Sequence, residues 1–359
     1  MSTPQITVLM AVYNGKKYLR EAIDSILNQT FKDFIFLIID DGSTDGTVEI
    51  IKSYKDTRIK LVINEKNMGQ IVSLNRGLKL IKTPFIARMD ADDISMSNRL
   101  GVLYDYMTKD RNLSVVSSYA IIIDENGNTL SYYKIPLCMR NMKFKALFDS
   151  PVNHGSSLMR IQHIRQMGLY NPELLTSADF NLWVKLLADD YTMLNIPEYL
   201  LKIRQHSKSQ LKSAKLESLC NEYSYTLDYY IKAFTSLEID FEQVKKLSFF
   251  LHHGSEFNKV DLKQIQTNFR NILKNLNFEY PAVKKLISYY YSIAHYHYHL
   301  GINCTYSKDY QKARSKFIKS FFTFPLMIKS LFAFFLTFTG KNSFHRVREL
   351  AKRIIFRIK

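Results

Sequence analysis

The sequence predicts an α/β domain with a mostly parallel sheet flanked by helices, followed by a smaller all-helical domain. Within residues 6–93, apolar runs alternate with helical patterns, and this alternation is typical of α/β proteins. The runs are almost continuously apolar, as in strands that are buried on both faces of a parallel sheet. After Ser213 the alternation stops and helical patterns dominate, which predicts the helical domain.

The expected elements follow one another in a regular order. Strands are predicted over 6–12, 34–39, 59–63 and 85–89, and helices over 16–28, 48–54 and 71–81. The next predictions are a helix over 97–107, strands over 113–116 and 119–123, a hairpin loop at 124–128 and a helix over 177–187. We expect domains at 1–210 and 211–340 and a basic tail at 341–359.

The net charge indicates which kinds of partner the protein could bind, and the cysteine content indicates the redox state of its compartment. Lys and Arg number 50 against 33 Asp and Glu, a net charge of +17 that favours nucleic acid, nucleotide-sugar phosphates or an acidic membrane surface. Cys138, Cys220 and Cys304 are widely spread, which indicates a reducing compartment and no zinc site or disulfide framework. We find no signal peptide and no apolar membrane span, so we expect a cytoplasmic protein.

An acidic cluster, Asp90, Asp92 and Asp93, follows the expected strand over 85–89. Like charges this close raise one another's pKa values and resist burial. A divalent cation, Mn2+ or Mg2+, would relieve the repulsion, because a few carboxylate oxygens and substrate phosphates hold such ions. The alternative is a solvated acidic turn that caps the helix beginning near Asn98.

Polar residues also stand at the carboxyl ends of two other expected strands, at Tyr13-Asn14 and at Asp40-Asp41-Gly42-Ser43. In open α/β sheets, ligands bind in the crevice beyond these ends. No G-x-G-x-x-G follows the first strand and no G-x-x-x-x-G-K-[ST] occurs, which disfavours a Rossmann dinucleotide site and a P-loop. Anionic groups of a ligand would then be neutralised by a metal and by basic side chains.

Four motifs follow one another in order: Val12-Tyr13-Asn14-Gly15, Ile39 to Thr47, Asn67-Met68-Gly69 and Asp90-Ala91-Asp92-Asp93. With this ordered set, the segment over residues 4–205 resembles the family 2 glycosyltransferases. The resemblance implies a GT-A fold and the inverting, metal-dependent transfer of a sugar from a nucleotide-diphospho-sugar. A UDP-sugar is the first candidate donor. The implied acceptor is a hydroxyl of a saccharide or a lipid-linked saccharide in surface polysaccharide biosynthesis.

The resemblance also implies roles for residues on the donor side. Tyr13 would stack on the nucleobase and Asp41 would accept a hydrogen bond from its ring N–H, although Asp-Gly is also common in turns. The other residues expected on the nucleotide-sugar are Asn14, Asn67, Asp90 and Asp92. The metal would be held by Asp92, Asp93 and His206. The segment Ile203-Arg204-Gln205-His206 could equally be a surface linker, with no contact to the diphosphate or the metal.

Two residues are implied on the acceptor side. Asp179 would be the general base that takes the proton of the acceptor hydroxyl; the alternative is a carboxylate that caps the helix over 177–187. Ala178 stands where the family often has a second carboxylate, so a single base is expected. His154 would line the acceptor site, unless it is a hydrogen-bonded structural residue.

The C-terminal third and the charge leave two further hypotheses open. Leu300-Gly301, Ala313, Phe317 and Pro325 fit one tetratricopeptide-type hairpin, and the tail over 341–359 fits a basic amphipathic helix on an anionic membrane surface or one packed on the domain. The alternative function is nucleic-acid binding or scaffolding by this basic region, but no recognised nucleic-acid motif occurs, so no nucleic-acid partner is expected. A nucleotidyltransferase would be expected to have a Gly- and Lys-rich phosphate loop near the start of the chain, and Val12-Tyr13-Asn14 is not such a loop.

Overall fold

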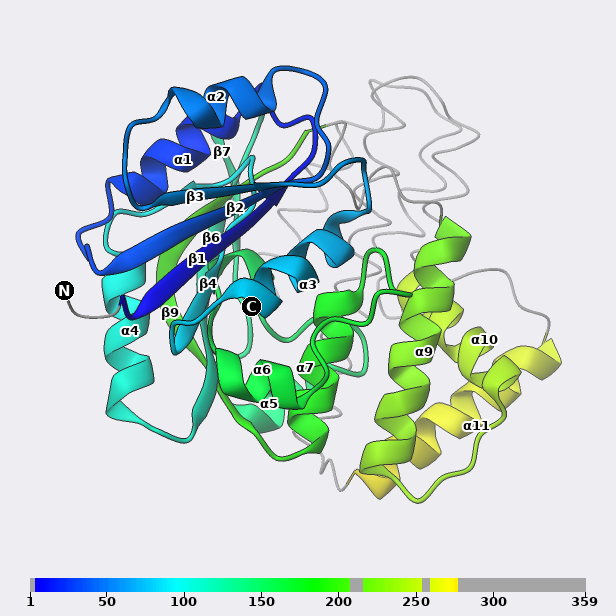
Figure 1. Ribbon diagram of the computed structural model, residues 1–359. Helices are drawn as coiled ribbons and strands as arrows, with labels where there is room; N and C mark the ends of the chain where they lie inside the picture. Colours follow the sequence, from blue (N-terminus) through cyan, green and yellow to red (C-terminus); the bar gives the residue numbers. More distant parts are fainter. Residues whose placement is uncertain (1–3, 207–215, 254–258, 277–359) are drawn as a thin grey trace, which may run out of the picture. The chain divides into compact units, whose positions relative to one another are not determined.

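The structure is a computed structural model that describes residues 4–206, 216–253 and 259–276. The chain forms two compact units, Met1–His252 and His253–Lys359. The first unit contains the sheet and the candidate site (Figure 1). In the second unit the structure describes helix α11, Lys259–Asn275, whose buried side chains Ile265, Phe269 and Ile272 share one face.

The first half of the sheet is parallel, as predicted. Its strands are β1 (Ile6–Val12), β2 (Phe34–Asp40), β3 (Ile59–Ile63) and β4 (Phe85–Arg88). β1 pairs in parallel with β2 and β4, and β2 pairs in parallel with β3. Every residue of β1 is buried, which explains why its sequence is apolar without alternation. The connecting helices are α1 (Leu19–Leu27), α2 (Thr47–Ser53) and α3 (Gln70–Leu80).

The second half of the sheet mixes parallel and antiparallel pairs. Its strands are β5 (Ile94–Ser95), β6 (Leu113–Ile123), β7 (Thr129–Tyr133), β8 (Leu158–Arg160) and β9 (Thr192–Arg204). The order across the sheet is β3-β2-β1-β4-β8-β6-β9-β5, and β7 forms a hairpin with β6. β8 is antiparallel to β4 and β6, whereas β9 is parallel to β6. The two short strands predicted over 113–116 and 119–123 are one strand, whose register against β9 shifts at Ser118 and Tyr119.

Helices lie on both faces of the sheet (Figure 1). The remaining helices are α4 (Arg99–Lys109), α5 (Met139–Lys145), α6 (Ile161–Gln166), α7 (Ala178–Ala188), α9 (Leu216–Phe234) and α10 (Phe241–His253). Gly77 of α3 faces Leu9 of β1: a Cβ at this position would lie 2.3 Å from Leu9 Cδ1. Glycine therefore allows α3 to approach the central strand closely.

The predicted fold class is confirmed, and helices do follow the sheet. α9 packs beside α7, with the rings of Phe180 and Tyr223 5.8 Å apart. The tetratricopeptide-type hairpin expected near 300–325 and the tail over 341–359 lie outside the described residues, so the proposed domain limits stay predictions. Among the described helices, none is both long and apolar enough to cross a membrane. Cys138 and Cys220 carry free thiols.

Candidate active site

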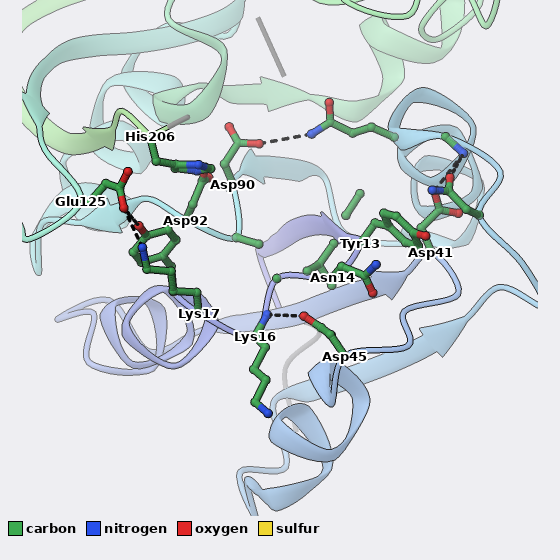
Figure 2. A pocket seen from close by; sticks show the side chains of 18 residues that line it. Tyr13, Asn14, Lys16, Lys17, Asp41, Asp45, Asp90, Asp92, Glu125 and His206 are labelled. Atoms are coloured by element: carbon green, nitrogen blue, oxygen red, sulfur yellow. Dashed lines mark hydrogen bonds and ion pairs between the residues drawn. The ribbon is translucent and has the colours of Figure 1, made fainter. Parts of the chain in front are cut away.

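A cleft of about 1100 Å³ opens beyond the carboxyl ends of β1, β2 and β4 (Figure 2). It is lined by the residues predicted to hold the nucleotide-sugar, which are Tyr13, Asn14, Asp41, Asn67, Asp90 and Asp92. His206 lines it too, from the end of β9. Asp93, His154 and Asp179 are not among its lining residues. The structure therefore brings most of the predicted donor-side residues into one cleft.

Tyr13 and Asp41 lie side by side at one end of the cleft (Figure 2). Tyr13 is 48% exposed, so its ring face is available to a planar ligand. Asp41 is 2% exposed, and its Oδ1 accepts hydrogen bonds from Asn64 Nδ2 at 2.6 Å and from the Met68 amide at 2.9 Å. Its Oδ2 accepts one from the Gly69 amide at 2.9 Å, which leaves room for a further donor.

Asn64, which directly follows β3, is a functional candidate that no sequence motif indicated. Its Nδ2 donates to Asp41 and, at 2.7 Å, to Ser73 Oγ, while its Oδ1 accepts a hydrogen bond from Arg76. Asn64 is 5% exposed. Asn64 therefore connects helix α3 to the Asp41 carboxylate in the cleft.

The loop after β2 binds the backbone of the loop after β1. Asn14 has a left-handed φ of 51°, and its Oδ1 accepts a hydrogen bond from the Thr44 amide at 2.9 Å. The Lys16 amide donates to Asp45 Oδ2 at 3.1 Å. Asparagine tolerates this backbone conformation, and its bond to Thr44 joins the loop that carries Tyr13 to the loop after β2.

The acidic cluster is partly buried and contacts two arginines. Asp90 Oδ1 accepts a hydrogen bond from Arg88 Nη2 at 2.6 Å, and the Arg88 side chain is 1% exposed. Asp93 is 4% exposed, and its Oδ1 accepts one from the Arg204 amide at 2.9 Å. Burial raises the pKa of Asp93 well above its usual range, and repulsion from Asp90 and Asp92 raises it further. The cluster therefore places three carboxyl groups close together beside the cleft, with Arg88 paired to one of them.

Asp92 and His206 lie next to each other in the wall of the cleft (Figure 2), and Asp92 Oδ2 is 2.9 Å from His206 Nε2. Burial and repulsion from Asp90 raise the pKa of Asp92, while His206 opposes that shift. A carboxylate oxygen and an imidazole nitrogen this close together suit a divalent cation. The described residues nevertheless contain no cluster of three His, Cys, Asp or Glu placed around one metal position. The protein would thus supply two ligands, and Asp93 is turned toward the Arg204 backbone.

Arg204 links the acidic cluster to the rim of the cleft. Its Nε donates to the Asp92 carbonyl at 3.0 Å, and its Nη1 donates to the Asp124 and Glu125 carbonyls at 3.3 and 3.1 Å. Its Nη2 pairs with Glu21. The guanidinium is therefore engaged by the protein itself. The same hairpin loop also contacts the segment before α1: Glu125 Oε2 lies 2.7 Å from Lys17 Nζ (Figure 2).

Asp179 is the second residue of α7 and is half-buried. Burial raises its pKa to about 6, the Phe180 amide opposes this shift, and repulsion from Asp149 and Asp90 adds to it. A carboxylate with such a pKa is suited to accept a proton near neutral pH. Because Asp90 contributes to the shift, Asp179 belongs to the same part of the molecule as the acidic cluster.

His154 lies in the short 3-10 helix His154–Ser156, and its Nε2 is 2.7 Å from Tyr170 Oη. Its ring also packs against Trp183. Burial and the positive charge of Arg88 hold the pKa of His154 well below its usual value, so the imidazole is neutral. Its contact with an acceptor stays a prediction.

Comparison with known proteins decides the family. The family model described as glycosyl transferase family 2 matches residues 7–166. An uncharacterized glycosyltransferase of Methanocaldococcus jannaschii, MJ1057, is 37% identical over 230 residues, which cover 61% of this chain and 78% of that protein. The chain belongs to glycosyltransferase family 2.

A second relative of this glycosyltransferase has a named reaction. It is the Escherichia coli UDP-Gal:alpha-D-GlcNAc-diphosphoundecaprenol beta-1,3-galactosyltransferase, 30% identical over 233 residues that cover 64% of this chain and 84% of that protein. Among solved structures, Staphylococcus aureus TarS 1–349 in complex with UDP-GlcNAc matches with a TM-score of 0.57 at 16% identity. The match covers 76% of this chain and 81% of TarS, and it confirms the GT-A-like fold.

Proposed function

We propose that this glycosyltransferase transfers a sugar, with inversion, from a nucleotide-diphospho-sugar to a hydroxyl of a saccharide or lipid-linked acceptor in surface polysaccharide biosynthesis. The observation that carries the proposal is the convergence of Tyr13, Asp41, Asp92 and His206 in one cleft. A UDP-sugar is the first candidate donor. The E. coli relative, whose printed name specifies UDP-Gal and a diphosphoundecaprenol-linked acceptor, supports both choices.

The proposed donor position follows from the chemistry of the cleft. The Tyr13 ring would stack on the base, and Asp41 Oδ2, which has one protein donor, would accept a hydrogen bond from the base N–H. Asn14 and Asn67 would lie along the nucleoside, and Asp90 would face the ribose or the donor sugar. The diphosphate would then lie toward Asp92.

Asp92 and His206 are the residues that would hold Mn2+ or Mg2+, with Asp93 behind them. A bound divalent ion would neutralise charge on the departing nucleoside diphosphate. Few protein ligands are needed, because Mg2+ commonly takes one or two carboxylates and completes its shell with substrate phosphates and water.

Asp179 would take the proton from the acceptor hydroxyl as that oxygen attacks the anomeric carbon. The new C–O bond forms on the face opposite the bond that breaks to the nucleoside diphosphate, so the configuration at the anomeric carbon inverts. The raised pKa makes this proton transfer more favourable than it would be for an ordinary aspartate. We propose that the reaction takes place at the cytoplasmic face of the plasma membrane, where the basic residues over 341–359 suit an anionic surface.

The direct test is transfer from a panel of UDP-, GDP- and TDP-sugars in the presence of Mn2+ or Mg2+. Asp179→Asn should abolish transfer while UDP binding is unchanged. Asp189→Asn, an exposed position at the other end of α7, is the matched control. Full turnover in Asp179→Asn would refute its role as base. Salt-sensitive binding of RNA or DNA, with no binding of any nucleotide-sugar, would instead favour the nucleic-acid hypothesis.

A further inference from the structure

Glu222 of α9 forms a buried junction with the residues that precede α7. Its Oε2 accepts hydrogen bonds from the amides of Thr176 and Ser177, both at 2.9 Å. The hydroxyl groups of the same two residues donate to it at 2.8 and 3.1 Å. Glu222 is 6% exposed, so one carboxylate oxygen satisfies four donors in a buried setting.

The junction replaces the usual cap of α7. Ser177 is the N-cap residue, yet its side chain makes no capping hydrogen bond within its own helix. Its hydroxyl is directed to Glu222 instead. An anionic group at this end of a helix is also favoured by the helix dipole. The start of α7 is thus held by a side chain 45 positions further along the chain.

α9 also packs against α7 at residues that follow Ser177. The Tyr223 ring packs on Phe180, and the side-chain Nδ2 of Asn181 donates a hydrogen bond to Thr226 Oγ1 at 3.4 Å. Contacts on both sides of Asp179, at Ser177 and at Phe180, therefore come from α9. These α9 residues lie outside the segment 7–166 that the family model matches.

We propose that Glu222 is a positioning residue for the transfer reaction: by fixing Thr176 and Ser177, it holds the first turn of α7 and so directs Asp179 toward the acceptor. The proposal rests on the proposed function, in which Asp179 is the base. On this proposal, α9 is required for full transfer activity because it carries Glu222. Displacements of about 1 Å at a reacting group can reduce rates by two orders of magnitude, so the effect should be measurable.

The test compares Glu222→Leu and Glu222→Gln with wild type in full-length protein, using UDP-sugar transfer and UDP binding. Leu removes the acceptor, and we expect kcat to fall by at least about tenfold while the donor KM changes by less than about twofold. Gln keeps an acceptor oxygen without the charge and should restore much of kcat. Asp228→Asn on the same helix, where the carboxylate pairs with the exposed Lys232 at 2.7 Å, is the control and should keep wild-type kcat.

If Glu222→Leu does not fold, Thr176→Val and Ser177→Ala take its place, because each deletes one hydroxyl donor and keeps the backbone bonds. A lower kcat at constant donor KM in these variants supports the proposal. A folded Glu222→Leu or Ser177→Ala/Thr176→Val double variant with wild-type kcat, or one altered only in donor KM, overturns it. Absence of transfer in the wild-type protein would instead refute the proposed function.

Discussion

His206 Nε2 lies 2.9 Å from Asp92 Oδ2, although 114 positions separate the two residues. The sheet creates this proximity, because β5 follows the acidic cluster and pairs antiparallel with β9, at whose end His206 stands. The Arg204 amide holds Asp93 at the same point. The pair is thus fixed by backbone pairing and not by flexible side chains alone.

Replacing His206 by Ala should weaken metal activation. Loss of one of two protein ligands should raise the Mn2+ concentration for half-maximal activity by at least about tenfold, equivalent to ~1.4 kcal/mol. The measurement is transfer rate against Mn2+ after treatment with a chelator. His163→Gln on α6, where the ring contacts Ser114, is the control. An unchanged Mn2+ response in His206→Ala would exclude His206 as a ligand.

Asn64→Asp should weaken donor binding. The change replaces the Nδ2 donor, 2.6 Å from Asp41 Oδ1, by a second carboxylate, and like charges at this distance repel. We expect the donor KM to rise by about tenfold or more, with a smaller change in kcat. Asn112→Asp, in an exposed turn, introduces the same charge elsewhere and should leave the donor KM unchanged. Equal KM values for both variants would show that Asn64 does not support the base site.

The residues that line the cleft could be predicted from the sequence because they follow apolar strands whose ends must meet at one edge of the sheet. Tyr13, Asp41 and Asp92 illustrate this rule. Asn64 and Glu222 could not be predicted, since their roles depend on tertiary contacts: Asn64 belongs to no motif, and Glu222 has the sequence context of an ordinary helical glutamate. Helices α5 and α6 were missed because they are short, at 7 and 6 residues. The length of β6 was underestimated because Ser117 and Ser118 interrupt its apolar run.

Transfer should lose activity on acidification through pH 6. Asp179 must be ionised to accept a proton, and its pKa is raised to about 6, so below that pH the rate should fall about tenfold per unit. Asp149→Asn should move this acidic limb to lower pH, because repulsion from Asp149 contributes to the raised pKa. The measurement is kcat/KM from pH 5 to 8, with Asp110→Asn as the control. A limb that stays in place or moves upward in Asp149→Asn would contradict this assignment.

Glu125→Gln should tighten binding of UDP at low ionic strength. Lys17 lines the cleft and pairs with Glu125 at 2.7 Å, so neutralising Glu125 makes the ammonium available to a diphosphate. Both side chains are exposed, so the difference from wild type should shrink as salt is added. Titration calorimetry at two salt concentrations measures it. Glu49→Gln on the outer part of α2 makes the same change in net charge, and an equal gain there would indicate a general charge effect.

Gly77→Ala should destabilise the fold. The new Cβ would lie 2.3 Å from Leu9 Cδ1 and 3.1 Å from Leu9 Cδ2, inside the packed interface of α3 and β1. Overpacking of this kind typically costs about 1–3 kcal/mol, more than the ~1 kcal/mol by which Ala favours a helix over Gly. Gly101→Ala on α4 is the matched control, because its Cβ would meet only Phe31 Cβ at 3.8 Å and should stabilise the protein by up to ~1 kcal/mol. Urea midpoints of the two variants should therefore move in opposite directions, and a Gly77→Ala midpoint at or above wild type would show that α3 can shift away from β1.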